Sequence, residues 1–285
     1  MAPNLKSSKI AFIGGGNMAA AIIGGLVAKG IDKQNITVSE PWEVNREKMA
    51  QLGVKTTTSN AEAFSGADIA ILAVKPQVAK GVCEELAGAS AGGKMALVVS
   101  IAAGIPLASL QKWLTPSGDG APSPHVVRVM PNTPALVGEG ASGLFAGEGV
   151  TEDEKELTGA LLASVSKATE WVDKEELIDV VTGLSGSGPA YFFALVEHMI
   201  ASAVKLGLSE DQAKRLAAQT CLGAGRMLVE SPESPSQLRQ NVTSPNGTTH
   251  AALQSFEASG FAEIVDKAVK AATSRGEELG KTLGG

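Results

Sequence analysis

The stretch that decides the fold is residues 9–19, KIAFIGGGNMA. Its first five residues are largely apolar and predict a β-strand, and an apolar pattern at helical spacing begins directly after the three glycines. The motif G-x-G-x-x-A, from Gly14 to Ala19, therefore lies between a strand and a helix. Glycines at such a turn let the backbone approach a pyrophosphate, and the helix N-terminus offers unpaired N–H groups. The stretch predicts a Rossmann-type dinucleotide-binding unit, whose cofactor contacts Gly14, Gly16, Asn17 and Met18.

The chain around this stretch alternates strands with helices up to about residue 145. Further apolar runs predict strands at residues 35–39, 69–74, 96–100 and 125–130. Amphipathic patterns predict helices at residues 17–29, 43–52 and 78–86. Continuous apolar strands separated by helices are typical of a parallel sheet that is covered on both faces.

After residue 150 the pattern becomes helical. Thr151 with Glu154, and Ser209 with Gln212, form capping boxes that open two helices. Other helices are expected at residues 175–181, 190–206, 249–259 and 261–279. No strand pattern is found in this half. We therefore expect an α/β Rossmann-type domain over residues 1–168 and an all-α domain over residues 169–285.

The helix expected at residues 190–206 contains the run YFFALV and is apolar on every side. A helix of this kind is buried on every side. In a small helical domain, a partner subunit is expected to cover it; packing against the first domain is the alternative.

Composition and charge exclude several classes of protein. The chain has 285 residues, a formal net charge of −6 and 44% hydrophobic residues. This acidic balance disfavours nucleic acid and anionic membranes as partners. Residues 10–28 carry no charge, but five glycines would break a membrane-inserted helix, so we expect a soluble cytoplasmic protein. Two distant cysteines and three scattered histidines predict neither a disulfide framework nor a metal site.

Glu40 lies 21 residues after Ala19, where the second strand should end. An acid at this place accepts hydrogen bonds from the adenosine ribose and repels a 2′-phosphate. Glu40 therefore favours NAD, although Arg46 and Lys48 are close enough in the sequence to serve a phosphate. An ordinary solvated carboxylate is the alternative.

Two further segments follow predicted strands, and ligands bind beyond such ends in open α/β sheets. The first is AVKPQ at residues 73–77, where Lys75 is either a contact for the cofactor phosphate or ribose, or a plain surface lysine. The second is PNTP at residues 131–134, where Asn132 suits a nicotinamide amide but also a structural turn.

A third segment, VTSPNGTT at residues 242–249, leads into a predicted helix. A proline-glycine turn with several hydroxyl side chains at a helix N-terminus is a small anion site. It would hold a carboxylate without a basic residue. An ordinary helix cap is the alternative.

Five motifs together resemble the pyrroline-5-carboxylate reductase family over nearly the whole chain. They are AVKP at 73–76, VSIAAGI at 99–105, RVMPNTP at 128–134, VTGLSGSGPAYFF at 181–193 and VTSPNGTT at 242–249. The resemblance implies transfer of a hydride from NAD(P)H to C5 of Δ1-pyrroline-5-carboxylate, which gives L-proline. It also implies a Rossmann domain followed by a helical dimerisation domain, with homodimers that often assemble further and complete the substrate pocket at their interface.

The resemblance also assigns roles to residues of this sequence. Cofactor binding falls to Asn60, Ala73, Val74, Lys75, Pro76, Ala102 and Asn132. Substrate binding falls to Ser244, Asn246, Gly247, Thr248 and Thr249. Thr249 is expected beside the ring nitrogen as the catalytic residue.

Two positions depart from the family's usual pattern. Position 246 is Asn where Gly is usual, and Asn is the residue that best replaces Gly at positive φ. Position 40 is Glu where many members carry a polar or basic residue, which shifts the expected preference towards NADH.

Two rival functions remain open at the level of sequence. A hydroxyacid dehydrogenase would need a lysine or histidine acid-base in the helical domain, and Lys205 and Lys214 lie beyond the apolar middle of their helices. A catalytically silent dinucleotide sensor would have no need of the loop at residues 244–249.

Overall fold

The structure is a computed structural model that describes residues 4–89, 96–116 and 123–284. The chain divides into two compact units. The first contains Met1–Gly186 and Ala271–Gly285, and the second contains Ser187–Lys270.

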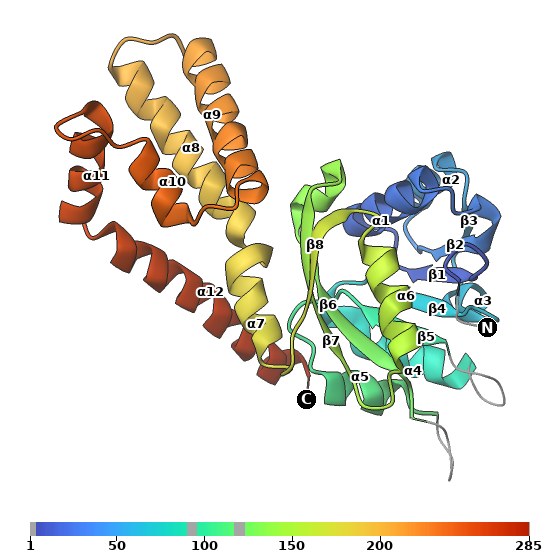
Figure 1. Cartoon of the computed structure of the whole chain (residues 1–285). Coiled ribbons are helices and arrows are strands. Elements are labelled where there is room, and N and C mark those ends of the chain that lie inside the picture. Colours follow the sequence, from blue (N-terminus) through green and yellow to red (C-terminus); the bar gives the residue numbers. More distant parts are fainter. Residues whose placement is uncertain (1–3, 90–95, 117–122, 285) are drawn as a thin grey trace. The chain divides into compact units, whose positions relative to one another are not determined.

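The first unit is built on an eight-stranded sheet with the order β3-β2-β1-β4-β5-β6-β7-β8 (Figure 1). The strands are β1 (Ile10–Ile13), β2 (Ile36–Ser39), β3 (Lys55–Thr57), β4 (Ile69–Leu72), β5 (Leu97–Ser100), β6 (Val126–Met130), β7 (Gly140–Ala146) and β8 (Ser166–Trp171). All neighbours pair in parallel except β6 and β7, which are antiparallel. The first six strands have the order of a doubly wound dinucleotide-binding sheet, and the order reverses between β1 and β4.

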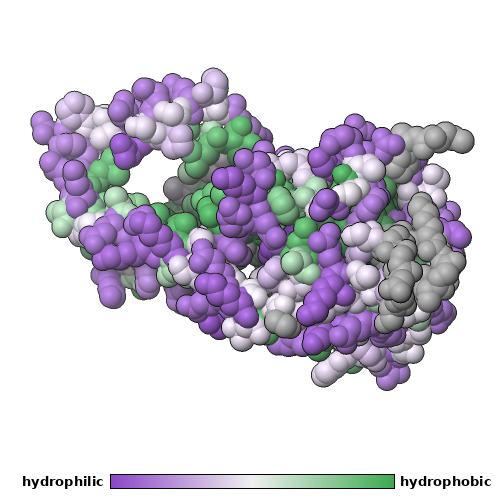
Figure 2. All heavy atoms as spheres, turned by 90° about the horizontal axis from the view of Figure 1, so that it is seen from below, coloured by the Kyte–Doolittle hydropathy of each residue, from purple (hydrophilic) through white to green (hydrophobic). Residues whose placement is uncertain are grey.

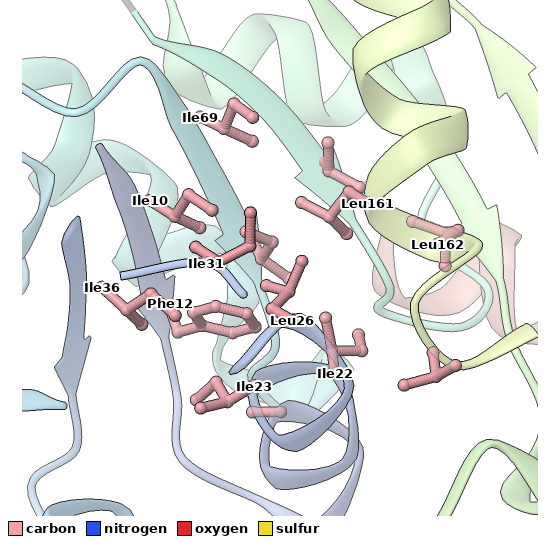
Figure 3. Close-up of a cluster of buried hydrophobic side chains, with 14 of the residues drawn as sticks. Ile10, Phe12, Ile22, Ile23, Leu26, Ile31, Ile36, Ile69, Leu161 and Leu162 are labelled. Atoms are coloured by element: carbon pink, nitrogen blue, oxygen red, sulfur yellow. The ribbon is translucent and has the colours of Figure 1, made fainter. Parts of the chain in front are cut away.

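Helices cover both faces of this sheet. They are α1 (Asn17–Ala28), α2 (Glu43–Gln51), α3 (Asn60–Phe64), α4 (Pro76–Ala89), α5 (Leu107–Leu114), α6 (Glu152–Leu162) and α7 (Leu177–Val181), with short helices at Lys33–Asn35 and Thr133–Val137 and a π-helix at Thr182–Gly186. Side chains alternate along β1: Ile10 and Phe12 join one core with α1 and α6, and Ala11 and Ile13 join the other with α4 and α5. Figure 3 shows the first of these cores. The predicted two-faced parallel sheet is confirmed.

Three strands, β3, β7 and β8, were not predicted, and the expectation of no strand after residue 150 was wrong because β8 lies there. β7 (Gly140–Ala146) is rich in glycine, alanine and serine, and an added Cβ at Gly143 would lie 2.7 Å from the Val181 side chain. β8 (Ser166–Trp171) is a mostly exposed edge strand without apolar alternation. Because β8 crosses residues 168 and 169, the boundary expected there falls inside the sheet, and the compact units divide after Gly186 instead.

The second unit is entirely helical within the part that the structure describes. Its helices are α8 (Gly188–Lys205), α9 (Glu210–Glu230), α10 (Pro235–Asn241) and α11 (Thr248–Ala258), and α12 (Phe261–Leu283) begins here and ends in the first unit. Both predicted capping boxes are present, at the starts of α6 and α9. The expectation of an α/β domain followed by a helical domain is confirmed.

The second unit lacks a core of its own as a single chain. Its only buried hydrophobic side chains, among the described residues, are Ala213 and Ala217. Phe192 and Phe193 of α8 are 56% and 69% exposed. Figure 2 shows apolar areas, in green, on the surface of this unit. Large exposed apolar surfaces mark sites of association, which agrees with the covering partner expected for the helix at residues 190–206.

Candidate functional site

The glycine loop after β1 fits closely between two neighbouring strand ends. Gly14 donates its N–H to the Ser39 carbonyl at 2.8 Å. Its φ is +102°, and an added Cβ would lie only 2.7 Å from the Ala73 carbonyl oxygen. Only glycine therefore suits this position, because both its backbone conformation and the space around it exclude a side chain.

The end of the loop leaves room above the N-terminus of α1. Gly16 is the N-cap of α1, and nothing lies within 4 Å of a Cβ added to it. No side chain caps this helix, and its first turn holds no acidic residue. Gly16 and Asn17 are exposed, and Met18 is half-buried. Free N–H donors beside open space fit a pyrophosphate, as the motif predicts.

Glu40 lies beside this loop, as expected, and its carboxylate is bound to the backbone. Oε2 accepts the Gly15 N–H at 2.8 Å, and Oε1 accepts the Trp42 N–H at 2.9 Å. The side chain is buried and forms no ion pair with any of the described residues. Arg46 donates instead to the Glu40 and Pro41 carbonyls, at 3.1 Å each. A negative charge thus stands at the end of β2, next to the glycine loop.

Asn60, which the resemblance assigns to the cofactor, connects the end of β2 with α4. Its Oδ1 accepts the Ser39 hydroxyl at 2.7 Å, and its Nδ2 donates to Glu85 Oε2 at 2.7 Å. These contacts fix the wall next to Glu40. Direct contact between Asn60 and a cofactor stays a prediction.

The segments after β4 and β5 lie at the same carboxyl edge of the sheet. Ala73 and Val74 are half-buried, Lys75 is exposed, and Pro76 begins α4. Lys75 forms no ion pair within the described ranges, so its ammonium group is available to a phosphate or a ribose. Ala102 is buried two residues beyond β5. These positions are consistent with the predicted cofactor contacts and do not test them.

Asn132 is buried, and both ends of its side chain are engaged. Its Oδ1 accepts the Ala141 N–H at 2.9 Å, and its Nδ2 donates to the Ser185 carbonyl at 3.1 Å. It thereby holds the loop after β6 to β7 and to the π-helix. The predicted contact with a nicotinamide amide stays a prediction.

The loop expected to bind substrate lies in the second unit, at the start of α11. Asn246 has a φ of 57°, the one positive value among the described non-glycine residues, and so replaces glycine in this turn. Gly247 donates its N–H to the Ser244 carbonyl at 3.0 Å and is the N-cap of α11. No side chain caps α11. Thr248 is exposed, and Thr249 is half-buried, with no hydrogen-bond partner for its hydroxyl among the described residues.

Comparison with known proteins places the chain in a family. A family model described as pyrroline-5-carboxylate reductase dimerisation matches residues 175–279, and one described as NADP oxidoreductase, coenzyme F420-dependent, matches residues 9–104. The pyrroline-5-carboxylate reductase of Pseudomonas aeruginosa is 50% identical over 281 residues, covering 98% of this chain and 100% of that protein. The chain belongs to the pyrroline-5-carboxylate reductase family.

Solved structures of the family have the same fold. The pyrroline-5-carboxylate reductase of Coxiella burnetii is 42% identical, with a TM-score of 0.88 over 96% of this chain and 98% of that one. The Plasmodium falciparum protein, solved with NADP bound, is 30% identical, with a TM-score of 0.83 over 97% and 100%. The chain is therefore an oxidoreductase of the CH–NH class that uses a nicotinamide cofactor, and its dimerisation domain supports self-association. The expected family and enzyme class are confirmed.

The sequence did not predict two residues that shape the carboxyl edge of the sheet next to the glycine loop. Gly15 supplies the N–H that Glu40 accepts, and Ser39 supplies both a carbonyl for Gly14 and a hydroxyl for Asn60. Gly15 is the middle residue of the glycine motif, so the motif could have identified it. Nothing in the sequence distinguishes Ser39 from any other strand serine.

Three other ionisable side chains of the reductase, Cys83, Arg128 and Glu175, have surroundings that indicate a structural role. Burial, followed by the nearby Glu84 charge, raises the pKa of the Cys83 thiol to about 12, so the thiol stays protonated and inert. The buried Arg128 pairs with Glu175, whose Oε1 also accepts the Leu107 N–H at 2.6 Å. Within the described ranges, no cluster of three or more His, Cys, Asp or Glu side chains could hold a metal ion, and none of the helices combines the length and the apolar character of a membrane span.

Proposed function

We propose that this chain reduces the imine of Δ1-pyrroline-5-carboxylate to give L-proline, with NADH or NADPH as the reductant. The observation that carries the proposal is the start of α11, where the half-buried Thr249 hydroxyl, which has no partner among the described residues, lies next to backbone N–H groups that no described side chain caps. One such site can hold a carboxylate and a ring nitrogen of the same small molecule.

The glycine loop and the N-terminus of α1 would bind the pyrophosphate of the cofactor. Gly14, Gly16, Asn17 and Met18 belong to this cradle, and Lys75 adds a free positive charge at the same edge of the sheet. When bound, the reduced nicotinamide supplies the hydride that adds to C5 of the pyrroline ring.

The substrate carboxylate would bind at the start of α11. Its partners are the Ser244 hydroxyl and the backbone N–H groups in the first turn of α11. Gly247 is the N-cap of this helix, and Thr248 is its first residue. The positive end of the helix dipole favours an anion there without a basic residue. Asn246 supports the turn that presents these groups. Holding the carboxylate also fixes which face of the ring is presented to the reductant.

Thr249 would act at the ring nitrogen. An imine becomes electrophilic when its nitrogen is protonated or accepts a hydrogen bond, and the product amine keeps that proton. The Thr249 hydroxyl donates one hydrogen bond to the nitrogen and accepts another from water, which supplies the proton. Its half-buried position without a partner among the described residues supports this role.

Glu40 favours NADH over NADPH in this proposal. Its buried carboxylate keeps two lone pairs beyond the two backbone N–H groups it binds, and these suit the ribose hydroxyls. A 2′-phosphate would bring a second negative charge to the same place. Arg46, the nearest cation in sequence, donates to backbone carbonyls and leaves the Glu40 charge uncompensated.

The active form would be a homodimer or a larger assembly of dimers. The helical unit buries only two hydrophobic side chains among its described residues, which is too little for a stable core. A second copy of the same unit would cover the exposed side chains of α8. The substrate pocket is then expected to be completed at this interface.

The proposal is tested by following the near-ultraviolet absorbance of NADH or NADPH with Δ1-pyrroline-5-carboxylate. Thr249→Val should lower kcat/KM by roughly 10- to 150-fold, the effect of losing one hydrogen bond to a charged group, and should leave NADH binding unchanged. The control is Thr282→Val, which removes an exposed hydroxyl that bonds only to its own helix in α12. A folded protein that binds NADH but never oxidises it with this substrate would contradict the reductase function.

A further inference from the structure

One tryptophan of this protein lies exposed beside the cofactor edge of the sheet. The chain has three tryptophans, of which Trp113 is 4% exposed and Trp171 is 39% exposed. Trp42 is 76% exposed and so contributes little to any core. An indole this exposed offers a large, flat apolar face to a ligand.

The backbone that carries Trp42 is fixed, although its indole is free. The Trp42 N–H is held by Glu40 Oε1 at 2.9 Å. The two carbonyls before it, of Glu40 and Pro41, accept hydrogen bonds from the Arg46 guanidinium at 3.1 Å each. Trp42 is also the N-cap of α2, with ordinary extended backbone angles. The indole therefore projects from a rigid base.

We propose that Trp42 binds the adenine ring of the cofactor by stacking. An acid at the end of the second strand of such a sheet marks the position of the adenosine ribose, and Glu40 has that position. The adenine is bonded directly to this ribose, so it must lie next to the segment that follows Glu40. Trp42 is the only aromatic residue of that segment, and Val44, 66% exposed in the first turn of α2, adds apolar surface beside it.

Stacking of the adenine on the Trp42 indole would raise the affinity of the protein for the cofactor. Replacing such an aromatic residue weakens nucleotide binding about 5- to 150-fold. This inference rests on the proposed cofactor site and is independent of the imine substrate. The Glu40 carboxylate then has a second task, because it joins the glycine loop, which receives the pyrophosphate, to the residue that receives the adenine.

The test measures binding of two cofactor fragments to the full-length protein by calorimetry. ADP-ribose contains the adenine, and reduced nicotinamide mononucleotide lacks it. Trp42→Leu should weaken ADP-ribose about 5- to 150-fold and leave the mononucleotide unchanged, whereas Trp42→Phe should recover most of the affinity. Trp171→Leu, the matched control at the other end of the sheet, should bind both fragments like the parent. ADP-ribose should also quench tryptophan emission in the parent and in Trp171→Leu, but not in Trp42→Phe.

Three results would overturn the inference. The first is unchanged affinity of Trp42→Leu for ADP-ribose. The second is equal weakening of both fragments, which would indicate damage to the whole site. The third is a shift in the sedimentation of Trp42→Leu with ADP-ribose binding intact, which would assign the indole to a contact between copies of the chain.

Discussion

Replacing Gly16 by alanine separates cofactor binding from folding in the glycine loop. The φ and ψ of Gly16 are −76° and −176°, which any residue adopts, and nothing lies within 4 Å of the added Cβ. Alanine is a poorer N-cap than glycine by about 1 kcal/mol, and it restricts the unfolded chain by about 0.4–1 kcal/mol. These effects oppose each other, so the free energy of unfolding should change by less than about 1 kcal/mol.

The same methyl group would enter the space proposed for the pyrophosphate. Losing one charge-assisted hydrogen bond from an N–H of α1 costs about 1.5–3 kcal/mol, which is roughly a 10- to 150-fold rise in the Kd of NADH. Gly14→Ala should behave in the opposite way. Its φ of +102° and the 2.7 Å approach to the Ala73 carbonyl should destabilise the fold by about 2–4 kcal/mol.

The assay pairs thermal unfolding with fluorescence titration of NADH, at one protein concentration for all variants, since dimer stability depends on concentration. Gly24→Ala serves as the control, because Gly24 lies in the same helix with nothing within 4 Å of an added Cβ. It should stabilise the protein by about 0.5–1 kcal/mol and bind NADH normally. The reasoning is refuted if Gly16→Ala binds NADH as tightly as the parent, or unfolds as easily as Gly14→Ala.

Three other changes should affect stability in defined ways. Gly25→Ala should destabilise by about 1–3 kcal/mol in thermal unfolding, unlike the helix control above, because its Cβ would lie 2.5 Å from a backbone carbonyl oxygen of the turn before β8. Glu175→Ala should cost about 3 kcal/mol in urea unfolding, because it leaves the buried charge of Arg128 without its partner; an unchanged midpoint would contradict this. Burial opposes the charge of Glu154, but hydrogen bonds from Thr151 and His125 outweigh it and lower its pKa below 4.5. The ionised Glu154 carboxylate therefore stabilises the fold above pH 4.5, and this stabilisation is lost as the pH falls through the lowered pKa. In Glu154→Gln, the melting temperature should depend less on pH below 4.5 than in the parent.

The sequence predicted the strands that consist of continuous apolar runs. It did not predict the strands whose place in the sheet depends on close contact with neighbouring backbone. β1, β4, β5 and β6 are apolar runs buried on both faces, and such runs are recognisable without a structure. β7 and β8 contain glycine or polar residues, and their place in the sheet depends on neighbours that are distant in the sequence. Because β7 and β8 were not predicted, the domain boundary was expected at residue 168, which lies inside the sheet.

The candidate site was predictable at the level of motifs but not of side-chain partners. The spacing from Ala19 to Glu40 placed an acid beside the glycine loop, and the structure has it there. The sequence did not indicate that Asn60 and Asn132 each use both ends of their amides within the protein. Such hydrogen bonds depend on which strands become neighbours, and no local pattern encodes that.

The course of α12 affects how the protein is made. This helix starts in the helical unit and returns to the first unit, where Ser109 donates to the Gly284 carbonyl and Gly280 packs against the Gly104 carbonyl. The segment from Ala271 onwards is translated after the helical unit, so the first unit remains incomplete on the ribosome until the whole helical unit has been synthesised. Domains of a growing chain generally fold from the N-terminus as units, and here that order is interrupted by an insertion. A chain that ended within the first part of α12, before Lys270, would therefore leave both units incomplete.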